Sequence, residues 1–159
     1  MERFFNTAGP NIPEDNYTID PLSRFDLEDV LTLIRQKRYF VMHAPRQTGK
    51  TSCMLALRDY LNHEGDYIAV YANVEGGQAS RNDAQSVVKS TVDMLAEQFR
   101  GIVKNNVPYQ LRDEVQQVGK DTMLSTYLRR LSESLLKPIV LIIDEIDALV
   151  GDSLVAVLR

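Results

Sequence analysis

Two short motifs in this sequence have residue types and spacing suited to phosphate and metal chemistry. Residues 44–51 read Ala-Pro-Arg-Gln-Thr-Gly-Lys-Thr, and residues 140–145 read Val-Leu-Ile-Ile-Asp-Glu. The first is a loop of the pattern A-x-x-x-x-G-K-T between an apolar run and a helix-like segment. The second is an apolar run that ends in two carboxylates. A loop that holds phosphate and a strand that delivers carboxylates to Mg²⁺ together predict an ATP site.

The loop supplies the contacts that a phosphate group requires. First-turn amides of a helix have no intrahelical partner and carry the positive end of the helix dipole, so they favour an anion. Gly49 suits a close approach of backbone to phosphate, Lys50 places an ammonium on the outer phosphates, and the Thr51 hydroxyl is a hard oxygen ligand for Mg²⁺. Ala44 stands where the pattern usually has its first glycine, which costs little if its φ is negative. The predicted nucleotide-binding residues are Ala44, Pro45, Arg46, Gln47, Thr48, Gly49, Lys50, Thr51 and Ser52.

The second motif predicts the metal and catalytic groups. Residues 139–143 form a continuous apolar run, which is typical of a strand buried on both faces of a parallel sheet. We expect Asp144, with Thr51, to hold Mg²⁺ and Glu145 to orient or deprotonate the attacking water. In the alternative interpretation, acids after a strand only cap the next helix, which is reasonable for Asp147 and Asp152.

Residues 46–51 resemble the Arg-Gln-x-Gly-Lys-Thr loop of P-loop ATPases of the AAA and STAND type, and residues 144–147 (Asp-Glu-Ile-Asp) resemble their Walker B motif. The opening stretch, residues 3–10, is similar to that of prokaryotic AAA-family ATP-binding proteins. This resemblance implies a three-layer α/β/α fold of the AAA-like class with ATP and Mg²⁺ as cofactors. In that class a sensor strand, an arginine finger and often a helical lid follow the Walker B strand. Arg46 is a candidate contact to the γ-phosphate or to a neighbouring subunit.

Composition favours a protein of the cytoplasm. The chain has 159 residues, a formal net charge of −4 and one cysteine, Cys53, which cannot form an internal disulfide. The charge indicates no general affinity for nucleic acid or membrane. Residues 1–5 do not show the basic start and apolar stretch typical of a signal peptide, and no apolar run approaches the length of a membrane span.

The elements expected to position the two motifs alternate between helices and strands. Residues 1–22, which hold three of the six prolines, are predicted to form an irregular arm, and residues 23–159 one ATPase domain. Ser23 to Asp26 resembles a capping box, and Asn82 and Asp121 are expected to cap later helices. The predicted helices span residues 24–37, 49–63, 82–103, 108–118 and 121–136, and the predicted strands 39–44, 67–73 and 139–143.

Strands alternating with helices predict a right-handed, parallel α/β sheet. In the ATPase class with a glutamate after the Walker B aspartate, a later strand lies between the first and third of these strands. Without it, the first and third strands would flank a gap or pair directly, and residues 153–159 would begin a helix without completing it. We therefore expect the chain to be the N-terminal portion of a longer ATPase, truncated after Walker B.

The base-binding residues are the least specified part of the predicted site. In AAA and STAND proteins the adenine packs against an N-terminal segment, and Tyr17, Ile19 and Pro21 form an apolar patch in such a segment here. Tyr17 and Ile19 are the candidate adenine contacts. Nothing in the spacing distinguishes adenine from guanine.

Three functions are compatible with these motifs. The first is Mg²⁺-dependent ATP hydrolysis that drives or resets an attached effector, either a C-terminal region or a self-associated copy of the chain. The second is a nucleotide-gated signalling or interaction module with little or no turnover, and an arginine finger and sensor would separate the two. A small-molecule kinase is the third, although P-loop kinases usually lack a glutamate in the position of Glu145.

Overall fold

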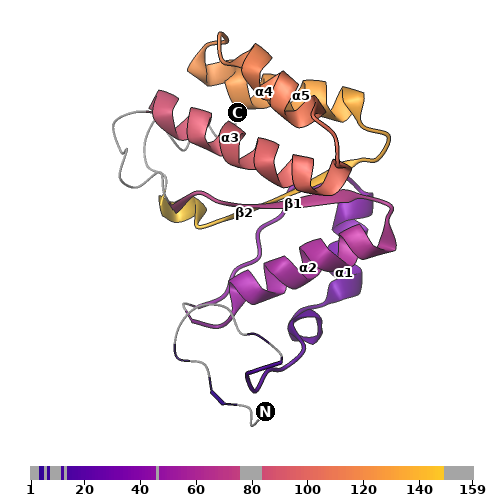
Figure 1. Ribbon diagram of the computed structural model, residues 1–159. Helices are drawn as coiled ribbons and strands as arrows, with labels where there is room; N and C mark the ends of the chain where they lie inside the picture. The colour runs from indigo at the N-terminus through magenta and orange to yellow at the C-terminus, as the bar shows by residue number, and fades with distance from the viewer. Residues whose placement is uncertain are drawn as a thin grey trace. The chain divides into compact units, whose positions relative to one another are not determined.

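The computed structural model describes residues 4–5, 7, 12, 14–45, 47–75 and 84–148. The chain divides into two compact units, Met1–Tyr60 and Leu61–Arg159. Figure 1 shows the order of the elements along the chain. Among the described residues, no helix is both long enough and apolar enough to cross a membrane. The predicted cap Asn82 and the predicted final helix at 153–159 lie outside the described residues.

The N-terminal arm folds around one buried polar side chain. Asn16 is only 3% exposed. Its Oδ1 accepts from the amide of Ile12 at 2.9 Å, and it forms an isolated parallel bridge with Phe4. The amide of Tyr17 donates to the carbonyl oxygen of Phe4 at 3.2 Å. The arm is therefore irregular, as predicted, but held by specific hydrogen bonds.

A 3-10 helix, η1 (Pro21–Arg24), precedes the first α-helix, α1 (Leu27–Arg35). Asp26 caps α1, because its carboxylate accepts from the amide of Asp29 at 3.0 Å. The predicted capping box starting at Ser23 is therefore wrong, and the helix begins three residues later than predicted. The periodicity is confirmed on the inner side of the helix, where Val30 and Ile34 are buried.

Residues 39–44 do not form the predicted strand. No strand of the described chain pairs with them, since the sheet there has two strands and both come later. Tyr39 and Val41 are 105% and 87% exposed. An apolar run has β-propensity, but it becomes a strand only where another strand satisfies its N–H and C=O groups. The segment runs instead as extended, irregular chain into the glycine-containing loop.

Helix α2 (Lys50–Glu64) follows that loop and agrees with the predicted helix at 49–63. Its buried side chains recur at helical spacing: Cys53, Met54, Leu57 and Leu61. Helix α2 connects the two units, because the division of the chain falls after Tyr60.

The second unit holds a parallel pair of strands, β1 (Ile68–Asn73) and β2 (Ile139–Asp144). Their register runs from Ile68 opposite Ile139 to Asn73 opposite Asp144, so both strands end at the same level. The α/β class and the parallel sheet are confirmed, and the pairing joins the second and third predicted strands. Side chains of β2 are half-buried up to Ile143, so the predicted full burial on both faces is wrong.

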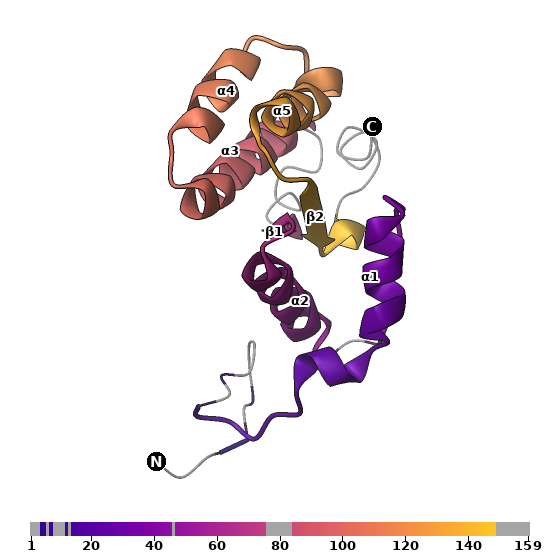
Figure 2. The ribbon, with the colours of Figure 1, turned by 90° about the vertical axis from the view of Figure 1, so that its right-hand side faces the viewer.

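Three helices cover one face of this sheet: α3 (Ala84–Val103), α4 (Val107–Val115) and α5 (Lys120–Ser134). Figures 1 and 2 show α3 next to β1, with α4 and α5 packed against α3. Gly119, not the predicted Asp121, is the N-cap of α5. Alternate residues of β1 face this layer, since a strand turns successive side chains to opposite sides. The core comprises Ile68, Val70, Ala72, Val74, Val88, Val92, Leu95, Phe99, Tyr127 and Leu131.

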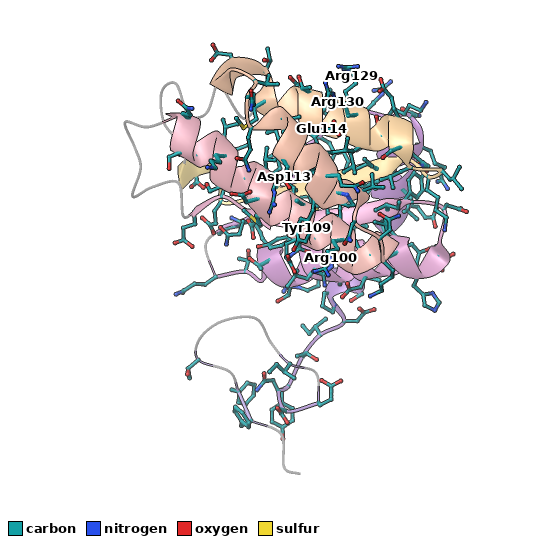
Figure 3. The ribbon with its side chains drawn as sticks, turned by 45° about the horizontal axis from the view of Figure 1, so that its top comes forward. Arg100, Tyr109, Asp113, Glu114, Arg129 and Arg130 are labelled. Carbon is teal, nitrogen blue, oxygen red and sulfur yellow. The ribbon has the colours of Figure 1, made fainter. Side chains whose placement is uncertain are left out.

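Charged and aromatic side chains hold α4 to its neighbours on the outer side of the layer. The guanidinium groups of Arg100 and Arg112 each lie over the ring of Tyr109, at 5.0 and 4.8 Å from its centroid. Arg130 on α5 pairs with Glu114 on α4 at 2.8 Å. Figure 3 shows Arg100, Tyr109, Glu114 and Arg130 following one another across the three helices. Both pairing groups of the Arg130–Glu114 bridge are partly exposed, so the bridge orients α4 more than it stabilises the fold.

Candidate functional site

The predicted phosphate loop is closed by its own lysine. Lys50 Nζ donates to the carbonyl oxygen of Ala44 at 3.0 Å, which joins the end of the loop to its beginning. Thr48 Oγ1 donates to the carbonyl oxygen of Pro45 at 2.7 Å. Gly49 has φ of 78°, a left-handed conformation that glycine adopts without steric cost. The structure thus brings together most of the predicted loop residues, while Arg46 lies outside the described residues.

Two further positions bear on the loop. Ala44 is not among the residues with positive φ, so an alanine fits the place where the pattern usually has a glycine. Gln47 adopts φ of 59° and is exposed. Left-handed conformations are uncommon for residues with a Cβ and concentrate in tight turns and binding loops. Gln47 and Gly49 both adopt positive φ, so the chain turns at these two residues just before α2.

Helix α2 begins immediately after Gly49. The amide of Cys53 donates to the carbonyl oxygen of Gly49 at 3.1 Å, which is the first hydrogen bond of the helical ladder. Thr51 and Ser52 lie in the first turn and are half-buried. A helix beginning at this point carries its positive end toward the loop, and this favours an anion there.

Arg24 is a residue at this loop that sequence reasoning missed. A Cβ added to Gly49 would collide with Arg24 Nη1, so the guanidinium occupies the space that glycine leaves open. Burial raises the pKa of the Cys53 thiol, and the charge of Arg24 lowers it by a smaller amount. A cation beside the positive end of a helix is unfavourable unless an anion accompanies it. No local pattern marks Arg24, because it lies far upstream of the loop, at the end of η1.

The predicted metal ligand Asp144 lies at the end of β2 and is 4% exposed. Its Oδ2 accepts from the hydroxyl of Tyr71 on β1 at 2.8 Å. Its Oδ1 accepts from the amide of Glu145 at 3.0 Å. The carbonyl oxygen of Asp144 accepts from the amide of Val74 at 3.2 Å, which extends the parallel ladder by one bond. The carboxylate is therefore held by donors on both oxygens.

Glu145, the predicted catalytic base, is exposed and has φ of 57°. A left-handed conformation costs a residue with a Cβ roughly 1–2 kcal/mol. Such conformations cluster at functional sites, where the surrounding structure maintains them. Glu145 follows the last residue of β2, and the short 3-10 helix η3 (Ile146–Ala148) comes next. Asp147 lies in η3 and is exposed.

The predicted Mg²⁺ ligands are two oxygen groups on Asp144 and Thr51. Within the described residues, no group of three or more His, Cys, Asp or Glu side chains could hold a metal ion. Mg²⁺ is commonly bound by one or two protein oxygens together with phosphate and water. Asp144 and Thr51 offer a carboxylate and a hydroxyl of this kind. They belong to different units, so their joint use of one ion remains a prediction.

The candidate adenine contacts Tyr17 and Ile19 are exposed by 53% and 73%. The ring of Tyr17 lies 5.0 Å from that of Phe5, centroid to centroid. Their role toward a base stays a prediction.

Comparison with known proteins identifies a family for nearly the whole chain. The profile of the family described as "Nephrocystin 3, N-terminal" matches residues 23–158. The chain belongs to this family. The match begins at the residue where the predicted domain begins and includes both motifs. No curated protein and no solved structure matches the chain. The family description names a region of a protein and no chemistry, so membership of the AAA and STAND classes remains a prediction.

Proposed function

We propose that this chain binds ATP with Mg²⁺ through the loop 44–52 and hydrolyses it with the help of Asp144 and Glu145. The proposal includes the three-layer P-loop fold of AAA and STAND ATPases. The observation that supports it most is the loop itself: a left-handed Gly49 leads into α2, and Lys50 lies across the loop on the carbonyl oxygen of Ala44. A nucleotide phosphate offers this ammonium a charged acceptor in place of a neutral one, which strengthens the hydrogen bond.

The proposed roles follow from the chemistry of each group. Lys50 and the first-turn amides of α2 bind the β- and γ-phosphates, and Arg24 adds a second cation beside Gly49. Asp144 and Thr51 hold the Mg²⁺ ion, which neutralises charge that develops on the phosphates. Glu145 orients the attacking water, for which an exposed carboxylate next to the metal ligand is suited.

The test is equilibrium binding of a fluorescent ATP analogue in the presence of Mg²⁺. Lys50→Ala is expected to weaken binding by about 10-fold to 100-fold, because a charge-assisted hydrogen bond contributes about 1.5–3 kcal/mol. Lys89→Ala is the matched control, since Lys89 is an exposed lysine on α3. Equal affinity of the Lys50→Ala variant and the parent protein would refute the proposal.

A nucleotide-gated module that holds ATP with little turnover is the alternative. It uses the same loop and the same metal ligands, and it differs only in the fate of the nucleotide. Phosphate release under conditions that saturate binding separates the two. In either case we propose that nucleotide state is passed to an attached effector region or to a second copy of the chain.

A further inference from the structure

The hydrogen bond between Tyr71 and Asp144 joins the two strands of the sheet. Tyr71 pairs in register with Ile142, and Asn73 pairs with Asp144, so Tyr71 and Asp144 are diagonal neighbours on one face. That face is opposite the α3–α5 layer, because Val70 and Ala72 on the other side of β1 belong to the helical core. The phenol reaches along the strand to Asp144 Oδ2 at 2.8 Å.

This contact orients the carboxylate rather than merely solvating it. Asp144 is buried, so its orientation depends on protein donors. The amide of Glu145 fixes Oδ1 at 3.0 Å, and the Tyr71 hydroxyl fixes Oδ2. Since each oxygen accepts from a protein donor, rotation of the carboxylate would break at least one hydrogen bond.

We propose that Tyr71 is a positioning residue that sets the Mg²⁺ affinity of Asp144. This inference depends on the proposed function. Partners that hydrogen-bond to a metal-ligating carboxylate hold it in the orientation that the ion requires, and their loss typically lowers metal affinity by about 10-fold to 100-fold. The hydroxyl of Tyr71 is the group that acts, since the ring alone makes no hydrogen bond to Asp144.

Tyr71→Phe removes that hydroxyl and keeps the ring. The measurement is a Mg²⁺ titration of ATP-analogue binding, compared with binding of the same analogue in EDTA. We expect the Mg²⁺ concentration at half-saturation to rise by about 10-fold in Tyr71→Phe, with unchanged affinity in EDTA. Tyr67→Phe is the matched control, because Tyr67 precedes β1, is half-buried and donates no hydrogen bond to Asp144. Its titration should superimpose on that of the parent protein.

A second readout measures the metal directly. Mn²⁺ replaces Mg²⁺, and electron paramagnetic resonance of free Mn²⁺ in the presence of a non-hydrolysable ATP analogue gives the metal affinity without turnover. Tyr71→Phe should bind Mn²⁺ with a Kd about 10-fold higher than that of the parent protein. A general structural defect would lower affinity in EDTA and in Mg²⁺ by the same factor, and that result would overturn the inference.

Asp144→Asn separates failure of the inference from failure of the proposed function. If Asp144→Asn shifts the Mg²⁺ titration and Tyr71→Phe does not, the role of Tyr71 is wrong and the metal site stands. If neither variant shifts it, Asp144 does not bind the ion and both proposals fail. A shift in both variants, larger for Asp144→Asn, supports both.

Discussion

The carboxamide of Asn62 closes the outer edge of β1 at Ala69. Its Nδ2 donates to the carbonyl oxygen of Ala69 at 2.8 Å, and its Oδ1 accepts from the amide of Ala69 at 3.0 Å. The amide of the preceding residue, Ile68, donates toward β2, to the carbonyl oxygen of Pro138. The polar groups of Ala69 therefore point away from β2, and one side chain takes the place of a neighbouring strand there.

Asn62→Ala should destabilise the protein by about 2–4 kcal/mol, because it leaves a buried N–H and a buried C=O without partners. Urea unfolding measures the difference. Asn105→Ala is the control: Asn105 also accepts from a backbone amide, that of Val107, but at an exposed position. We expect that control to lose about 1 kcal/mol or less. Equal losses in the two variants would contradict the assignment of Asn62 as an edge partner.

Tyr127→Phe should leave the stability unchanged or raise it by up to about 1 kcal/mol at neutral pH. Tyr127 is fully buried, and its hydroxyl has no hydrogen-bond partner within the described residues. A buried hydroxyl without a partner is unfavourable relative to an apolar group of the same shape. Thermal unfolding of the two proteins at pH 7 is the measurement, and a loss above 1 kcal/mol would show that the hydroxyl has a partner after all.

The same phenol predicts a pH dependence. Burial raises the pKa of Tyr127 well above its usual range, and the charge of Arg112 opposes this by a smaller amount. The contribution of neutral Tyr127 to the free energy of unfolding is complete below the unfolded pKa near 10. This contribution declines as the pH rises above that value. Between the unfolded and folded pKa values the decline is about 1.4 kcal/mol per pH unit. Tyr127→Phe should lack this part of the alkaline decline, as urea unfolding between pH 8 and 11 would reveal.

Gly49→Ala should weaken nucleotide binding and destabilise the loop by roughly 1–2 kcal/mol. Gly49 has φ of 78°, and an added Cβ would displace the guanidinium of Arg24. Gly101→Ala is the control, because Gly101 lies in α3 and a Cβ there meets nothing within 4 Å. In a helix, alanine is favoured over glycine by about 1 kcal/mol, so this control should gain stability. Calorimetry of unfolding and ATP-analogue binding test both variants.

Glu145→Gln should preserve ATP binding and reduce turnover by roughly 10²-fold or more, because the amide cannot accept a proton from water. Phosphate release at saturating ATP is the measurement. Glu145 is exposed and its side chain is not a ligand in the proposed metal site, so the Mg²⁺ titration of binding should not change. Turnover at the parental rate would rule out the role of Glu145 as the base.

Local patterns predicted the parts of the fold that depend on neighbours in sequence. The period of apolar residues identified α2 and α3, and the apolar runs bounded by turns identified β1 and β2. Residues 39–44 carry the same kind of apolar run and form no strand, because strand formation also requires a partner. The caps predicted at Ser23 and Asp121 were wrong for a related reason, because several residues near each helix start can occupy the N-cap position. In the structure Asp26 and Gly119 occupy it.

The candidate site was predictable to the extent that its residues are contiguous. The glycine and lysine of the loop and the acids after β2 were located from motifs alone. The proximity of Arg24 to Gly49 and the hydrogen bond of Tyr71 to Asp144 were not predictable in this way. The first pair lies on either side of α1 in the sequence, and the second pair meets through strand pairing. Such contacts follow from chain topology, and no spacing in the sequence indicates them.

The register of the sheet has a consequence for the order of folding. Ile68 and Ile139 pair across a segment that contains all of α3, α4 and α5. Closing a flexible loop of about 70 residues costs roughly 4 kcal/mol of chain entropy, so β1 and β2 meet late unless the helices first condense between them. The side-chain hydrogen bonds within the phosphate loop join residues at most six positions apart, such as Lys50 and Ala44. The hydrogen bonds of the phosphate loop can therefore form early while the chain is being synthesised. The hydrogen bond between Tyr71 and Asp144 forms only after the whole helical layer has assembled.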